Sequence, residues 1–159
     1  MTTTKVELYR RLVGQLCGLL QGQRDLVANA ANAAALIYHT LPELNWAGFY
    51  ILKGDELLLG PFQGKPACTR IAVGKGVCGK AAQELRTIVV ENVHDFPGHI
   101  ACDAASNSEI VVPVVSQEGR LIGVLDLGSP LPGRFDAEDQ AGLEGLVEVF
   151  VAATEVDLG

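Results

Sequence analysis

The chain has 159 residues, of which 48% are hydrophobic and 19% are charged, and its formal net charge is −7. This length and composition are typical of one globular domain, and we expect residues 1–159 to form it. The acidic balance argues against nucleic-acid binding and against docking on an anionic membrane, and no apolar run is long enough to cross a bilayer.

The first forty residues predict two helices. Because the start of the chain lacks the apolar core of a signal peptide, we expect a cytoplasmic protein. Leucines recur at helical spacing over residues 8–20, and Cys17 follows the same stripe, where we expect a small buried hydrophobic residue. A second, alanine-rich helix is expected over residues 24–38, and Pro42 ends it.

Short strands dominate the rest of the chain. The pattern predicts strands at residues 46–52, 56–62, 70–73, 87–90, 109–115 and 121–127, with a helix inserted within 74–84. Residues 92–108 form a long polar loop, and loops of that length are often functional. Asp136 caps a last helix that runs to about residue 155. This order predicts an α+β fold, in which helices flank an antiparallel sheet.

Period-two alternation sorts the side chains of the first strand by face. Trp46, Gly48 and Tyr50 share one face, and the glycine leaves room between the two rings. The rings either belong to the core or form the wall of a small pocket.

The last strand places a carboxylate among apolar residues. Ile122, Val124, Asp126 and Gly128 are expected to share a face, and a buried Asp126 must find a partner. It either bonds to backbone or a turn, or faces a pocket and binds an ammonium group. Since a hairpin would bring Glu109 near Asp126, two acids and two aromatic rings favour a free amino acid as ligand.

Three of the four cysteines lie in predicted loops or at element ends, where a thiol can be exposed: Cys68, Cys78 and Cys102. Cys78 follows a glycine-rich turn at a helix N-terminus, a position that lowers a thiol's pKa. Three independent structural cysteines remain the alternative. Zinc held by these three and His99 is disfavoured, because no C-x₂-C pair is present.

Six segments resemble the free methionine-(R)-sulfoxide reductases, which are single-domain proteins of the GAF fold. They are residues 45–50 (NWAGFY), 60–68 (GPFQGKPAC), 74–79 (GKGVCG), 96–103 (FPGHIACD), 106–113 (SNSEIVVP) and 123–126 (GVLD). The resemblance covers nearly the whole chain. Its cysteine spacing is specific, because ordinary GAF domains lack this trio.

The resemblance implies thiol-dependent reduction of free methionine-(R)-sulfoxide. Cys102 is similar to the catalytic cysteine, which attacks the sulfoxide sulfur, releases methionine and becomes a sulfenic acid. Cys68 resembles the principal resolving cysteine, and Cys78 the third cysteine, able to form an alternative disulfide. How these two divide the roles stays open. Thioredoxin would reduce the disulfide as an external reductant, with no bound cofactor or metal.

The resemblance also implies roles for the pocket residues. Trp46 and Tyr50 would hold the methyl-sulfoxide end of the substrate. Glu109 would protonate or hydrogen-bond the sulfoxide oxygen, and Asp126 would bind the polar groups, the ammonium first. A homodimer is compatible with the family.

One position departs from the family pattern. Members usually carry Asp-x-Asp-Ser where this chain has Asp126, Leu127, Gly128 and Ser129. Losing a charge-assisted substrate bond costs about 1–3 kcal/mol, which is roughly 5- to 150-fold in catalytic efficiency. The alternative function is therefore a non-enzymatic GAF module that binds a small ligand or senses redox state.

Overall fold

The computed structural model describes residues 3–98 and 106–156, and within them six strands form one antiparallel sheet. The helices are α1 (Lys5–Leu20), α2 (Leu26–Thr40), α3 (Gly76–Glu84), α4 (Ala137–Ala153) and the short 3₁₀ helix η1 (Val93–Asp95). The strands are β1 (Trp46–Lys53), β2 (Glu56–Gly64), β3 (Arg70–Ala72), β4 (Ile88–Val90), β5 (Ser108–Val115) and β6 (Leu121–Ser129).

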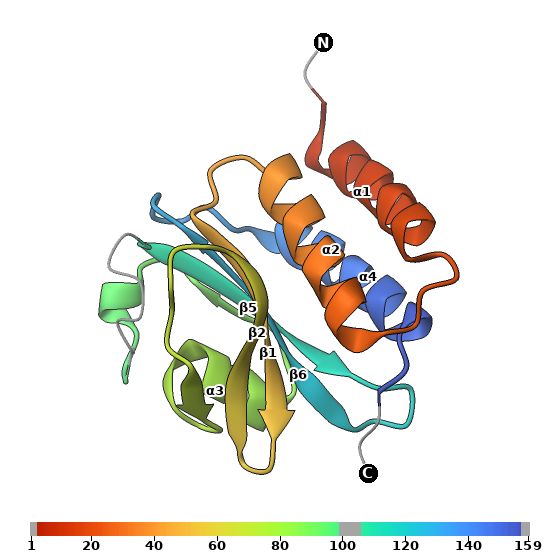
Figure 1. The fold of residues 1–159 in the computed structure, drawn as a ribbon. Helices are drawn as coiled ribbons and strands as arrows, with labels where there is room; N and C mark the ends of the chain where they lie inside the picture. The colour runs from red at the N-terminus through yellow and green to blue at the C-terminus, as the bar shows by residue number, and fades with distance from the viewer. Residues whose placement is uncertain (1–2, 99–105, 157–159) are drawn as a thin grey trace.

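The strand order is β3-β2-β1-β6-β5-β4, which places β1, β6 and β5 at the centre of the sheet. Helices α1, α2 and α4 lie on one side of it, and α3 lies on the other (Figure 1). The predicted α+β architecture is therefore confirmed. The expected elements are all present, and the addition is η1, which lies inside the segment predicted as loop.

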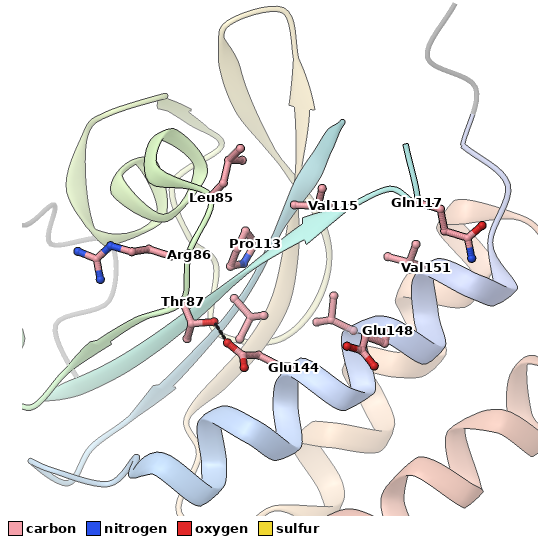
Figure 2. Close-up of a pocket in the computed structure, with 11 residues that line it drawn as sticks. Leu85, Arg86, Thr87, Pro113, Val115, Gln117, Glu144, Glu148 and Val151 are labelled. Carbon is pink, nitrogen blue, oxygen red and sulfur yellow. Dashed lines mark hydrogen bonds between the residues drawn. The ribbon is translucent and has the colours of Figure 1, made fainter. Parts of the chain in front are cut away.

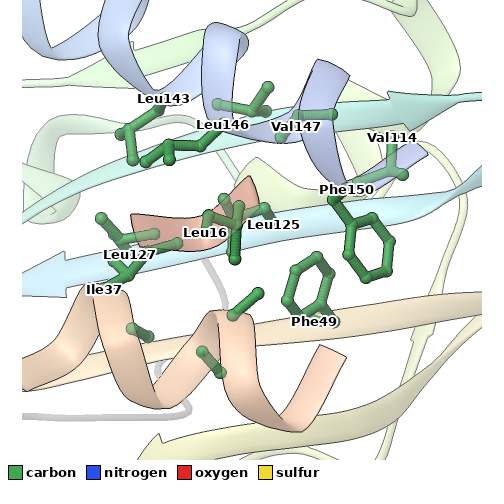
Figure 3. Close-up of a cluster of buried hydrophobic side chains, with 14 of the residues drawn as sticks. Leu16, Ile37, Phe49, Val114, Leu125, Leu127, Leu143, Leu146, Val147 and Phe150 are labelled. Atoms are coloured by element: carbon green, nitrogen blue, oxygen red, sulfur yellow. The ribbon is translucent and has the colours of Figure 1, made fainter. Parts of the chain in front are cut away.

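Alternating side chains of the central strands fill two separate cores. Phe49, Leu125 and Leu127 point toward the three helices and pack with Leu16, Leu143 and Phe150 (Figure 3). Trp46, Tyr50, Val111 and Val124 point the other way and pack with α3. Because α3 packs on this face, a polar group of the sheet beneath α3 is shielded from water.

Two of the predicted burial assignments are wrong. Cys17 is exposed, because the buried stripe of α1 runs through Leu12, Leu16 and Leu20. Ile122 packs against the three-helix side rather than sharing the face of Asp126. The cause is an irregularity in the β5–β6 pairing, where Val114 opposes Gly123 but Val115 opposes Leu121, so that Ile122 is an extra residue.

A buried carboxylate joins the first turns of α1 and α4. Asp139 is 1% exposed and accepts hydrogen bonds from Tyr9 Oη at 2.7 Å and from Lys5 Nζ at 2.7 Å. Arg134 lies 3.3 Å from the same carboxylate. Asp136 caps α4 as predicted and forms a capping box with Asp139. A buried charge held this way has its partners in place, so it is tolerated in the core.

A cavity of about 410 Å³ opens between α4 and the β4–β5 edge. Its wall includes Thr87, whose hydroxyl donates to Glu144 at 2.5 Å (Figure 2). None of the predicted site residues that the structure describes lines it. Within residues 3–98 and 106–156, no helix is long and apolar enough to cross a bilayer.

Two glycines of α4 provide a matched test of the α1–α4 packing. A Cβ at Gly142 would lie 2.2 Å from Tyr9 Cγ, whereas a Cβ at Gly145 would meet nothing within 4 Å. We expect Gly142→Ala to destabilise the protein by about 1–3 kcal/mol through overpacking. Gly145→Ala should stabilise it by about 0.5–1 kcal/mol, because alanine loses less entropy in a helix.

Urea denaturation of both variants measures these free energies of unfolding. Changes of the same sign in the two variants would contradict this packing of Tyr9 against α4.

Candidate active site

The antiparallel pairing of the central strands brings the two predicted acids together. Glu109 on β5 is opposite Gly128 on β6, and Asp126 is opposite Val111. Glu109 and Asp126 therefore lie diagonally on the same face of neighbouring strands, the face covered by α3. The predicted approach of these two acids is confirmed.

The two carboxyl groups are hydrogen-bonded to each other. Burial, together with the charge of Asp126, raises the pKa of Glu109 well above its usual value. Burial also raises the pKa of Asp126, although its hydrogen bonds to Glu109 and Cys78 oppose that shift. Since Glu109 keeps its proton to a higher pH, it donates to the Asp126 carboxylate, and two like charges are avoided.

Cys78 is the third member of this cluster. It lies in the first turn of α3, is 5% exposed, and its Sγ is 3.3 Å from Asp126 Oδ2. Burial raises the pKa of the Cys78 thiol, and the nearby carboxylates raise it further. The expectation of an exposed thiol with a lowered pKa is wrong here, because burial beside two acids outweighs the helix N-terminus.

Cys78, Glu109 and Asp126 place their potential metal-ligating atoms within 4.8 Å of one another. Because the pKa of each group is raised, a cation would have to displace protons to bind. The zinc set considered from the sequence includes His99 and Cys102, which lie outside the described residues.

Trp46 and Tyr50 line the same face of β1, as predicted, and both rings are buried. Their centroids are 6.0 Å apart, and the ring of Phe62 also stacks with Trp46, at a centroid distance of 5.2 Å. Gly48 is required between them, because a Cβ there would lie 2.3 Å from Phe62 Cβ and 2.7 Å from the Trp46 ring. The pairing of Gly48 with Asp126 brings this aromatic stack next to the acids.

The two carboxylate oxygens of Asp126 differ in their hydrogen bonding. Among the residues that the structure describes, the buried Oδ1 has no hydrogen-bond partner. A buried carboxylate oxygen without a donor costs free energy, so this atom is suited to accept a bond from a ligand.

Ser106 and Asn45 occupy the space beside Gly128. Ser106 Oγ donates to Asn45 Oδ1 at 3.1 Å. A Cβ at position 128 would lie 2.6 Å from Ser106 Oγ and 3.1 Å from Asn45 Oδ1. A side chain at Gly128 therefore requires the Ser106 hydroxyl to rotate away.

The cysteines fall into three groups. Cys17 and Cys78 are free thiols, and Cys68, in the segment between β2 and β3, is disulfide-bonded. Cys102 lies outside the described residues, so its predicted role is not tested. The structure thus brings Cys78, Glu109 and Asp126 together beside the Trp46–Tyr50 stack.

Comparison with known proteins identifies the family. The GAF domain pattern matches residues 28–155. The chain is 52% identical over 154 residues to the free methionine-R-sulfoxide reductase of Escherichia coli, and the match covers 95% of this chain and 93% of that protein. The chain belongs to the free methionine-(R)-sulfoxide reductase family. The fold and family implied by the sequence motifs are both confirmed.

Solved structures extend the family likeness. A free methionine-R-sulfoxide reductase from Neisseria meningitidis, solved with its substrate, is 42% identical with a TM-score of 0.91, covering 96% of this chain and 92% of that chain. A candidate GAF sensor protein from Burkholderia vietnamiensis is 60% identical with a TM-score of 0.93, covering 96% of each chain.

Sequence reasoning missed the contacts that the aromatic pair makes with the chain after β2. Trp46 Nε1 donates to the Lys65 carbonyl at 3.0 Å, and Tyr50 Oη donates to the Cys68 carbonyl at 2.9 Å. The sequence did indicate that a buried Trp and Tyr need hydrogen-bond partners for the indole N–H and the phenol O–H. It does not indicate which carbonyl groups these donors reach.

The free thiols provide a test of the Cys78 environment. We expect iodoacetamide to modify Cys17 readily at pH 8 and Cys78 far more slowly, because Cys78 is buried and its pKa is raised. Asp126→Asn removes a neighbouring negative charge and should speed modification of Cys78. Peptide mass spectrometry of the labelled protein measures both rates. Equal labelling of the two cysteines in the unaltered protein would refute the assignment.

Proposed function

We propose that this protein reduces free methionine-(R)-sulfoxide to methionine, using cysteine thiols and thioredoxin. The observation that carries the proposal is the half-buried Glu109–Asp126 pair beside the Trp46–Tyr50 stack. It combines a protonated acid, a carboxylate oxygen without a partner and an aromatic surface. A small zwitterion with an apolar arm fits these three features, and the family relationship supports the choice of sulfoxide.

Glu109 is the proton donor in the proposed reaction. Its raised pKa keeps the carboxylic acid form in a pH range where an ordinary glutamate is ionised. An acid of this kind can protonate the sulfoxide oxygen as the sulfur is attacked. Catalysis that needs this proton is lost as the pH rises through the pKa of Glu109.

Asp126 binds the substrate ammonium in this proposal. Its Oδ2 is held by Cys78, and the Oδ1 has no partner among residues 3–98 and 106–156. An ammonium group bonded to Oδ1 would supply the missing donor and a positive charge at once. Because a residue within a peptide has an amide nitrogen in place of this ammonium, the arrangement favours a free amino acid.

Cys102 and Cys68 carry the redox chemistry. The Cys102 thiolate attacks the sulfoxide sulfur, and the protonated oxygen is transferred to Cys102, which becomes a sulfenic acid as methionine leaves. The Cys68 thiolate then displaces that oxygen as water and forms a disulfide, which thioredoxin reduces without a bound cofactor. That Cys68 is already disulfide-bonded, while Cys78 is a free, buried thiol, supports Cys68 as the resolving residue.

The reaction is tested with the separated epimers of methionine sulfoxide in a thioredoxin-coupled assay of NADPH oxidation. We expect turnover of the free (R) epimer and none of the free (S) epimer or of N-acetylmethionine-(R)-sulfoxide. No turnover of any of them would overturn the proposal in favour of a GAF module that binds a ligand or senses redox state.

Two cysteine variants serve as controls for the same assay. Cys102→Ser should form no methionine, whereas Cys68→Ser should form up to one methionine per chain and then stop, since the disulfide cannot form. Methionine formation by Cys102→Ser would contradict the assignment of the attacking residue.

The missing second acid is tested at Gly128. Gly128→Asp and Gly128→Asn displace the Ser106 hydroxyl equally, so their difference isolates the charge. We expect the Asp variant to exceed the Asn variant in kcat/KM by about 5- to 150-fold, the equivalent of one charge-assisted substrate bond. Equal kcat/KM values would show that a carboxylate at this position contributes nothing in this chain.

A further inference from the structure

Two side chains of β1 end in hydrogen bonds to one short segment, residues 65–68, between β2 and β3. Trp46 Nε1 bonds the carbonyl at the start of the segment and Tyr50 Oη bonds the carbonyl at its end, at 3.0 and 2.9 Å. The segment has no regular secondary structure, and its last residue is the disulfide-bonded Cys68. A rigid strand therefore holds both ends of the segment that carries this cysteine.

Glycines allow the indole to reach the segment. Gly64 has a φ of 126°, in the left-handed region, and a Cβ there would lie 2.7 Å from Trp46 Cδ1. Gly48 makes room on the other side of the same ring. The stacks of Trp46 with Tyr50 and Phe62 then fix both ring planes, so the two donors point in defined directions.

The hydroxyl of Tyr50 is committed to this contact. The residue is 2% exposed, and burial raises the pKa of the phenol, so it stays a donor. Removing the hydroxyl would leave the Cys68 carbonyl without this bond while leaving the ring in place.

We propose that Trp46 and Tyr50 are positioning residues for disulfide formation, holding the 65–68 backbone so that the Cys68 sulfur is presented to its partner. This inference rests on the proposed function for the identity of that partner, Cys102. In the step concerned, the Cys68 thiolate forms an S–S bond to the sulfenic sulfur, the S–O bond breaks, and the oxygen leaves as water after taking up a proton. Cys68 is oxidised and the sulfenic sulfur is reduced.

Positioning acts on both the rate and the equilibrium of this step. The rate of an intramolecular attack depends on effective concentration, and misplacement by about 1 Å can cost on the order of 100-fold. The same loss of effective concentration makes the disulfide easier to reduce. A side chain that only lined the substrate pocket would change neither quantity.

The test is Tyr50→Phe, with Tyr38→Phe as the matched control, because Tyr38 lies on α2 and packs its ring against His39. In glutathione redox titrations we expect the equilibrium constant of the Cys68 disulfide to fall about tenfold in Tyr50→Phe, or about 30 mV, and to stay unchanged in Tyr38→Phe. In Tyr50→Phe, the rate of thioredoxin-supported turnover should fall about tenfold more than the rate at which the first methionine is formed.

Trp46→Phe removes the other hydrogen bond and should shift the same two quantities in the same direction. An equilibrium constant within twofold of the unaltered protein in both variants would overturn the inference. So would equal losses in first turnover and recycling, which would place the Tyr50 hydroxyl at the substrate step. Because the titration needs no substrate, it decides the inference even if the unaltered protein forms no methionine and the proposed function fails.

Discussion

The hydrogen bond between Glu109 and Asp126 is the contact on which the candidate site depends. It exists because β5 and β6 pair antiparallel and because α3 covers the face that both acids share. In water the two groups would ionise separately. Under α3 burial raises the pKa of both groups, and the pKa of Glu109 is raised further, so Glu109 keeps its proton to a higher pH than Asp126 does. The acid–base character of the candidate site is thus a consequence of the packing of α3 on this face of the sheet.

Much of this arrangement was predictable from local patterns. Strand alternation placed Trp46 with Tyr50, and the hairpin placed Glu109 near Asp126, since both depend only on a period of two and on chain order. The cap at Asp136 is also a local signal, and the structure shows it. Predicting these features does not require knowing which elements far apart in the sequence pack together.

The features that sequence reasoning got wrong depend on distant contacts. Cys17 is exposed because Leu12 and Leu16 set the buried face of α1, whose first turns meet α4 through the buried Tyr9 and Asp139. Ile122 changes face because one extra residue enters the β5–β6 ladder. A helix start would activate an exposed thiol, but α3 packs on the sheet and places the buried Cys78 thiol against the Asp126 carboxylate. A pKa depends on everything packed around the group, so a motif alone cannot predict its direction.

The residue at position 128 affects the pKa of Glu109. The position is directly opposite Glu109 on the neighbouring strand, so a carboxylate there would add a second negative charge close to the Glu109 carboxyl group. In this chain the adjoining space belongs to the Ser106–Asn45 hydrogen bond, a neutral pair. The pKa of Glu109 is therefore raised by burial and by one neighbouring carboxylate rather than two. An added acid would strengthen attraction for a substrate ammonium and, through the same charge, hold the Glu109 proton more tightly, so binding and proton transfer would respond in opposite directions.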